Sequence, residues 1–268
     1  MNILEAIPSE AKIKAILTQS TFGKRPFCPR CGSSHIKRSE KRYRCPKCRK
    51  PFSMTSASWL RGMKISYQEL WFLLYCWQKK IPFHLTVEMS KLSHMTVRRW
   101  RRRFQEHLVY ESPLLKGLVE IDESFIGKRK TNNQQIVLGA WSRRQRRVVL
   151  RCVSNRDQGT TDRFILRHVT NKETTIFTDS AGCYQGIDTF FGYEHITCNH
   201  SIFHFGPTNL IENIWSRFKR FITRIYHHYH KKWLSLLVRE FEARINNPEL
   251  FESPDIYLQT SLYAVPSR

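Results

Sequence analysis

The side chains best suited to phosphoryl-transfer chemistry lie in the stretch PTNLIENIWSRFKR at residues 207–220. Its opening proline and threonine are typical of a helix start. Residues three, four and seven apart share a helix face, so Asn209, Glu212 and Lys219 form one polar stripe. The carboxylate could hold a metal ion and the lysine a phosphate. An ordinary surface helix can carry the same residues, so the interpretation depends on the rest of the chain.

Two further carboxylates belong to segments that predict β-strands. Asp122 lies in the middle of the run 117–127, and Asp179 ends the run 174–179. Parallel strands present their carboxyl ends to the ligand crevice of an open sheet, so both aspartates could converge with Glu212. Such oxygens suit Mg²⁺ or Mn²⁺, and two ions about 3.5–4 Å apart can activate the attacking hydroxyl and stabilise the leaving oxygen. The alternatives are an edge-strand charge at Asp122 and a turn or helix cap at Asp179.

Hydrophobic periodicity after residue 117 predicts the elements that hold these carboxylates. We expect strands at 117–127, 135–142, 147–153, 174–179 and 193–197, and helices over 160–169, 180–184, 207–220 and about 231–246. The order β-β-β-α-β-α-β-α-α predicts an α/β fold. From residue 248 onward no pattern is readable, and we expect a loosely packed tail.

Four cysteines form two CxxC pairs, Cys28 with Cys31 and Cys45 with Cys48. Each pair can form a tight turn that presents two thiolates, and four thiolates satisfy tetrahedral Zn²⁺ without an open position. A segment this short buries too little apolar surface to fold without such a metal. We therefore predict a structural zinc ribbon, with coincidental pairs or a redox dithiol as the alternative.

The formal net charge is +23 over 268 residues, and it is concentrated in the first part of the chain. Residues 1–110 hold 23 Lys and Arg against 6 Asp and Glu, whereas residues 111–268 hold 22 against 16. Such a basic segment attracts polyanions, most commonly nucleic acid. A membrane surface or an acidic protein would not explain the zinc ribbon. We find no apolar run of membrane-spanning length and no signal segment, so we expect a soluble, intracellular protein.

The segment 84–107 has the pattern of a helix-turn-helix. We expect a short helix over 86–92, a turn at 93–94 and a second helix from residue 96, with an apolar face at Val97, Trp100 and Phe104. The other positions hold the arginines that we predict to contact DNA, Arg98, Arg99, Arg101, Arg102 and Arg103. A basic amphipathic helix of another kind is the alternative.

Together the segments predict five parts. They are an N-terminal helical arm (1–24), a zinc ribbon (25–56), a helix-turn-helix domain (57–112), a catalytic domain (113–250) and a C-terminal tail (251–268).

In combination and in order, these motifs resemble the DDE insertion-sequence transposases with an N-terminal zinc ribbon (ISXO-like), which are related to the eukaryotic Merlin elements. The resemblance covers nearly the whole chain, through FCPRCGSSHI, YRCPKCRKPFS, IDESFIGKRK, IFTDSAGCY, CNHS, TNLIENIWSRFKR and REFEARIN. It implies an RNase H-like mixed-sheet catalytic core and Mg²⁺-dependent DNA cleavage and strand transfer at transposon ends.

The resemblance implies that Asp122 and Asp179 are metal ligands. The family uses either Asn or Glu at the third position, and this chain offers both Asn209 and Glu212. We favour Glu212, because an anionic oxygen suits Mg²⁺ better than an amide does. Asn209 would then orient water or DNA.

Three basic side chains complete the expected site. Lys219, with Arg220 beside it, would contact DNA phosphate. His200 in CNHS also matches a family position, although a loop histidine with an ordinary structural role is an equal alternative.

The sequence therefore predicts a DNA transposase that binds terminal inverted repeats, cleaves one strand and joins the freed 3′-hydroxyl to target DNA. Paired ends favour a homodimer or a larger assembly. The expected location is the cytoplasm, with the nucleoid, in a prokaryote, or the nucleus in a eukaryote. The alternatives are an inactive or repurposed zinc-ribbon DNA-binding protein and a resolvase- or repair-type nuclease.

Overall fold

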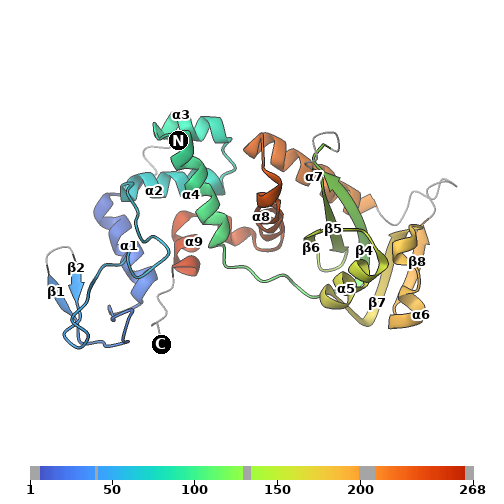
Figure 1. Cartoon of the computed structure of the whole chain (residues 1–268), viewed down its shortest axis with the longest axis horizontal. Helices are drawn as coiled ribbons and strands as arrows, with labels where there is room; N and C mark the ends of the chain where they lie inside the picture. Colours follow the sequence, from blue (N-terminus) through green and yellow to red (C-terminus); the bar gives the residue numbers. More distant parts are fainter. Residues whose placement is uncertain (1–6, 40–41, 129–133, 199–208, 263–268) are drawn as a thin grey trace. The chain divides into compact units, whose positions relative to one another are not determined.

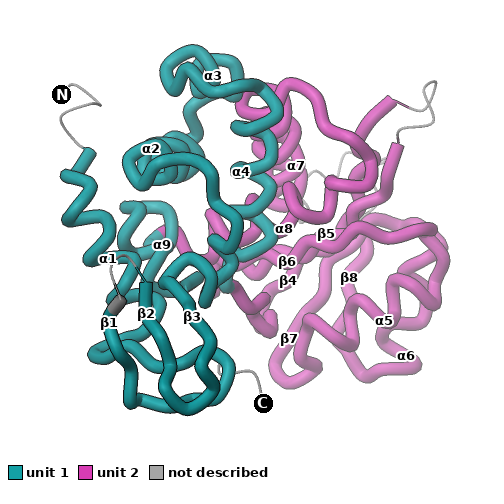
Figure 2. Tube along the Cα trace, turned by 60° about the vertical axis from the view of Figure 1, so that its left-hand side comes forward, with its two compact units in different colours: residues 1–109, 249–268 teal, residues 110–248 magenta. Residues whose placement is uncertain are grey.

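The computed structural model describes residues 7–39, 42–128, 134–198 and 209–262. The chain forms two compact units, residues 1–109 with 249–268 and residues 110–248 (Figure 2). Among the described residues, none of the helices combines the length and hydropathy needed to span a bilayer.

The first unit contains a small antiparallel sheet and the described helices that precede residue 110. Its elements are α1 (Glu10–Phe22), β1 (Lys37–Ser39), β2 (Arg42–Arg44), β3 (Pro51–Phe52), α2 (Tyr67–Gln78), α3 (Phe83–Ser90), α4 (His94–Glu106) and α9 (Pro254–Ser261), with η7 (Pro248–Phe251) at its boundary. Polar caps fix the helix starts. The Ser66 hydroxyl accepts a hydrogen bond from the Glu69 amide and the Glu69 carboxylate accepts one from the Ser66 amide, which forms a capping box at α2.

The C-terminal segment is part of the core of this unit. The Trp77 ring contacts the rings of Phe104 and Tyr257, with centroids 5.6 and 5.3 Å apart. The Tyr257 hydroxyl, which is fully buried, donates a hydrogen bond of 2.7 Å to the Phe104 carbonyl. Within the described residues, which end at 262, helix α9 therefore replaces the loosely packed tail that the sequence led us to expect.

The second unit is an α/β domain. Its strands are β4 (Leu115–Ile126), β5 (Gln135–Ser142), β6 (Arg147–Val153), β7 (Val169–Asp179) and β8 (Glu194–Cys198). Its helical elements are α5 (Gln158–His168), η3 (Gly182–Tyr184), α6 (Ile187–Phe191), α7 (Asn209–Phe221), η5 (Ile222–Tyr226), η6 (Lys231–Trp233) and α8 (Leu234–Asn246).

The five strands form one mixed sheet in the order β6-β5-β4-β7-β8. The first three strands pair antiparallel, and β4, β7 and β8 pair parallel. This order and these directions are those of an RNase H-like fold. The predicted fold class, an α/β mixed-sheet core preceded by zinc-ribbon and helix-turn-helix segments, is confirmed.

Strand alternation gives the sheet two apolar faces, each covered by helices (Figure 1). Val137 and Val148 face the cluster formed with α7, η5 and α8. Their neighbours Leu138 and Val149 face the opposite cluster, formed with α5, η3 and α6. Successive side chains of β4 therefore point alternately toward α7 and toward α5.

Candidate active site

The parallel pairing of β4 with β7 brings the two predicted aspartates to the same level. Glu120 pairs with Phe177 in this register, and two residues further along each strand lie Asp122 and Asp179. The Arg143 guanidinium donates to the Glu120 carboxylate and lies 5.0 Å from the centre of the Phe177 ring. Glu120 and Phe177 thus share the α7 face of the sheet, and period-two alternation places both aspartates on that face.

Asp122 is held in a half-buried, electronegative environment. The indole Nε1 of Trp215 on α7 donates a hydrogen bond of 2.9 Å to Asp122 Oδ2. The pKa of Asp122 is raised to about 6, chiefly by burial and in addition by the negative charges of Glu123 and Asp179, while hydrogen bonds from the Glu123 backbone and from Trp215 oppose this rise. A bound cation would reverse the effect of these like charges.

A glycine makes room for this indole. Gly139 on β5 is the antiparallel partner of Asp122. A Cβ atom at Gly139 would lie 2.6 Å from Cη2 and Cζ2 of Trp215 and 2.8 Å from Cδ2 of Leu150. The indole therefore lies over the backbone of β5 where any other residue would place a side chain. Neither Trp215 nor Gly139 stands out as a site residue in the sequence.

The first turn of α7 is hydrogen-bonded to Glu120 of β4, the strand that carries Asp122. Glu120 is fully buried, and its Oε2 accepts hydrogen bonds from the amides of Leu210 and Ile211 at 3.0 and 2.9 Å. Its Oε1 accepts from Arg143 Nε at 2.6 Å. Amides in the first turn of a helix lack partners within the helix, so this carboxylate satisfies two of them. The sequence patterns do not predict this role for Glu120.

Helical spacing separates the two candidates for the third position. Glu212 precedes Trp215 by three residues and Lys219 follows it by four, so both lie within about 60° of the indole around the helix axis. Asn209 lies about 120° from Trp215. Glu212, Asn209 and Lys219 are all exposed. The flank of α7 that reaches Asp122 is thus the flank that carries Glu212.

The three carboxylates are not drawn together to ligand distance. Within the described part of the chain, only the zinc-ribbon cysteines bring three or more potential ligand atoms within 4.8 Å of one another. Asp122, Asp179 and Glu212 do not form such a group in this structure. His200 and the start of the predicted 207–220 helix, Pro207 and Thr208, lie outside the described residues.

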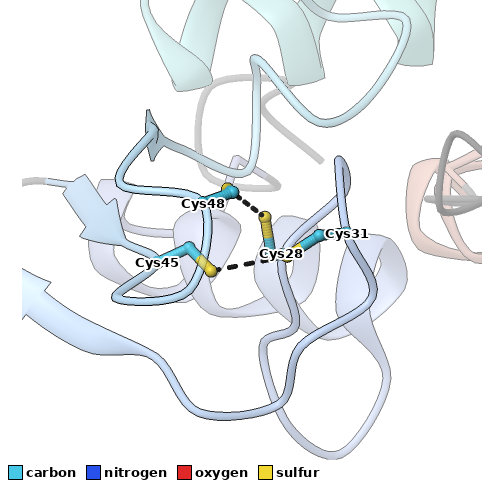
Figure 3. Close-up of side chains that lie close together, drawn as sticks. All are labelled: Cys28, Cys31, Cys45 and Cys48. Carbon is cyan, nitrogen blue, oxygen red and sulfur yellow. Dashed lines mark hydrogen bonds between the residues drawn. The ribbon is translucent and has the colours of Figure 1, made fainter.

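The zinc-ribbon cysteines have the geometry of a tetrahedral thiolate site (Figure 3). The Sγ atoms of Cys28 and Cys48 lie 3.6 Å apart, and those of Cys31 and Cys45 lie 3.5 Å apart. Four thiolates about 2.3 Å from one Zn²⁺ would be about 3.8 Å from one another, so the four residues fit a structural zinc ion with no open position.

The two cysteine turns share one backbone design. The Gly32 amide donates to the Cys28 carbonyl, and the Arg49 amide donates to the Cys45 carbonyl. Gly32 and Arg49 occupy the same place in each turn, and both have positive φ, 70° and 59°.

Helices α3 and α4 form the predicted helix-turn-helix pair, with Lys91 in the left-handed conformation between them and Ser93 as the N-cap of α4. The first helix begins at Phe83, three residues before the predicted start. The arginines Arg98 and Arg99 are exposed on α4.

Two of the five predicted DNA-contacting arginines are instead used within the unit. Arg101 is buried, and its Nη2 donates to the Ile81 carbonyl and to Thr86 Oγ1 at 2.6 and 2.7 Å. Arg103 donates to the Trp59 carbonyl and lies over the Trp100 ring. The prediction that Arg101 contacts DNA is therefore wrong, because its guanidinium is buried and joins α4 to α3. Arg102 is half-buried.

Comparison with protein families shows which class of protein carries this combination of domains. The ISXO2-like transposase domain matches residues 114–246, and the transposase zinc-ribbon domain matches residues 8–51. The chain belongs to the zinc-ribbon DDE transposase family. The transposase therefore carries the catalytic domain of a polynucleotidyl transferase behind a zinc ribbon, as the motifs implied.

The solved structures similar to the transposase include integrases. The catalytic core domain of BIV integrase is 11% identical, with a TM-score of 0.35, over 49% of this chain and 84% of that chain. The HTLV-2 integrase catalytic core domain in complex with magnesium is 12% identical, with a TM-score of 0.36, over 56% and 99%. The simian T-cell lymphotropic virus intasome in complex with PP2A regulatory subunit B56 gamma is 10% identical, with a TM-score of 0.39, over 68% and 75%. No curated protein gives a significant match.

Proposed function

We propose that this transposase binds the terminal inverted repeats of its element and catalyses metal-dependent DNA cleavage followed by strand transfer. The observation that carries the proposal is the level placement of Asp122 and Asp179 on adjacent parallel strands, with Trp215 of α7 bonded to the first of them.

The proposed metal ligands are Asp122, Asp179 and Glu212. Their donor atoms are carboxylate oxygens, which suit Mg²⁺ or Mn²⁺, and burial together with the nearby charges of Glu123 and Asp179 raises the pKa of Asp122, an effect that a bound cation would oppose. Bound ions would lower the barrier by activating the attacking hydroxyl and stabilising the leaving oxygen. The three carboxylates would close to ligand distance around those ions.

The protein's own groups orient the reactants. The Trp215 indole donates a hydrogen bond to Asp122 Oδ2, and this bond fixes the orientation of the Asp122 carboxylate. Lys219, exposed on the same flank of α7, would bind a DNA phosphate, and Asn209 would orient water or DNA. Water attacks first and the freed DNA 3′-hydroxyl attacks second, so no covalent bond between protein and DNA forms.

End recognition is proposed for the zinc ribbon and for the exposed face of α4. Arg98 and Arg99 are exposed there, and Arg220 is exposed on α7. Phosphate contacts from such residues make binding strongly dependent on salt. Because two ends must be joined to one target, we propose that the active form is a dimer or a larger assembly.

The test is nicking of a supercoiled donor plasmid with Mg²⁺ by the full chain. Asp122→Asn and Asp179→Asn should abolish nicking while the affinity for end DNA is retained. Asp188→Asn, at an exposed aspartate on α6, is the matched control and should nick normally. Full activity in either active-site variant would refute the assignment.

Two other outcomes would favour the remaining alternatives. A wild-type protein that binds end DNA but never nicks it would be a DNA-binding protein without catalysis. Preference for branched DNA over end DNA in competition binding would indicate a resolvase- or repair-type nuclease.

A further inference from the structure

Glu120 joins three elements of the catalytic domain through one buried carboxylate. It is 0% exposed and lies on β4, two residues before Asp122. One of its oxygens accepts from two amides in the first turn of α7, and the other accepts from Arg143, which follows β5.

We propose that Glu120 is a positioning residue, which fixes the first turn of α7 and so sets the place of Glu212 relative to Asp122. This inference rests on the proposed function, because it takes Glu212 to be the third metal ligand. Glu120 would act through the helix and would not touch the reacting atoms.

Two hydrogen bonds connect α7 to neighbouring positions of β4. Ile211 is bonded to Glu120, and Trp215 is bonded to Asp122. Four residues of helix rise about 6 Å, and two residues of strand span about 6.6–6.8 Å. The spacing of the two bonds along α7 is therefore comparable with their spacing along β4. Glu212 lies between the two bonded residues, so neither its height nor its rotation can change while both bonds are intact.

The same carboxylate is linked to the strand of the second aspartate. Arg143 pairs with Glu120, and its guanidinium lies over the ring of Phe177 on β7. Phe177 precedes Asp179 by two residues. The contacts of Glu120 therefore extend to all three of the elements that carry the proposed metal ligands.

Charge explains why a carboxylate is suited to this position. An anion is favourable at a helix N-terminus, where the amides point outward. A buried carboxylate also needs a cation or several hydrogen bonds, and Glu120 has both. A glutamine could accept from the amides but would leave Arg143 without its ion pair.

The same domain offers a matched control. Glu242 on α8 is also 0% exposed, forms an ion pair with Arg151, and accepts a hydrogen bond from the Leu150 amide of β6. Removing its charge should destabilise the domain in a similar way without changing the start of α7.

The experiment compares Glu120→Gln with Glu242→Gln in the full chain, at a temperature where both variants are folded. Three quantities are measured: amide hydrogen exchange at Leu210 and Ile211, Mn²⁺ affinity by titration, and the nicking rate on bound donor DNA. For Glu120→Gln we expect faster exchange at both amides, weaker Mn²⁺ binding and a nicking rate lower by about 10- to 100-fold, since a misplacement of about 1 Å can cost that much. For Glu242→Gln we expect none of these changes, and end-DNA affinity should be unchanged in both variants.

Equal losses of rate in the two variants would mean that Glu120 acts only through stability, and would overturn the inference. So would a wild-type rate in Glu120→Gln when Asp122→Asn is inactive, a result that leaves the proposed function standing. If the wild type does not nick DNA, the proposed function fails, whereas hydrogen exchange and Mn²⁺ titration still decide the positioning role. If Glu120→Gln does not fold, Arg143→Gln replaces it, because that side chain is 31% exposed and its loss also breaks the ion pair.

Discussion

Gly139→Ala should disturb the active site through a single methyl group. The new Cβ would lie 2.6 Å from two atoms of the Trp215 ring. Carbon atoms in contact are normally about 3.5–4.0 Å apart, so the indole must move by about 1 Å. Leu150 Cδ2 would lie 2.8 Å from the new atom, and because Leu150 is fully buried it limits the movement of β5.

The magnitude follows from two opposing effects on stability. Overpacking a core costs about 1–3 kcal/mol, and replacing glycine by alanine returns about 0.4–1 kcal/mol by restricting the unfolded chain. We expect the free energy of unfolding to fall by about 1–2 kcal/mol. The moved indole would also lose its bond to Asp122, so the nicking rate should fall by about 100-fold, as a displacement of about 1 Å can cause.

A double-mutant cycle identifies the cause. Trp215→Phe removes both the ring atoms that clash and the indole donor. In that background Gly139→Ala should cost much less, because contacting residues show coupling energies of about 0.5–3 kcal/mol. Urea unfolding gives the stabilities and donor nicking gives the rates. Gly159→Ala on α5 is the control, since its new Cβ would make ordinary contacts, and it should stabilise the helix by about 0.5–1 kcal/mol. Equal costs of Gly139→Ala in both backgrounds would refute the reasoning.

Three further predictions concern the first unit. Cys48→Ser removes one of four thiolates, so the zinc content should fall from about one ion per chain to none in a colorimetric release assay; retained zinc would contradict the site. Arg99→Gln should reduce the slope of log affinity against log salt by about 0.9 without changing Tm, whereas Arg101→Gln should lower Tm because its guanidinium is buried; the reverse pattern would show that the two roles are misassigned. Tyr257→Phe should lower the free energy of unfolding by about 1 kcal/mol, because the buried Phe104 carbonyl loses its donor, and chemical denaturation measures this.

Local patterns predicted the strands well where turns bound them. Strands β5 and β6 begin and end as predicted, because apolar β-branched runs there stop at charged or polar turns. Strand β7 begins at Val169, five residues before the predicted start. The register between β4 and β7 shifts at this point, and Glu173 has a positive φ, so the run looked broken in the sequence.

The residues that hold the site in place could not be read from local patterns. Glu120, Gly139 and Trp215 acquire their roles only when β4, β5 and α7 pack together, and these elements are distant in the sequence. Two weak signals were present. A glycine in the middle of a strand often marks a close approach of another group, and an acid two residues from Asp122 lies on the same strand face.

Two errors in the first unit had signals that were available. Arg101 follows Val97 by four residues and precedes Phe104 by three, so helical periodicity places it on the buried face. Pro254 is suited to the first turn of a helix, which α9 confirms. The density of arginines in α4 favoured DNA contact for Arg101. The position of α9 near the end of the chain favoured a loosely packed tail.

The most direct test of the central claim is the position of Mn²⁺ by anomalous diffraction from crystals of the metal-loaded protein. The account predicts ions about 2.0–2.2 Å from carboxylate oxygens of Asp122 and Asp179, with Glu212 as the third protein ligand and Asn209 outside the coordination sphere. Mn²⁺ bound by Asn209 in place of Glu212, or bound away from both aspartates, would contradict it.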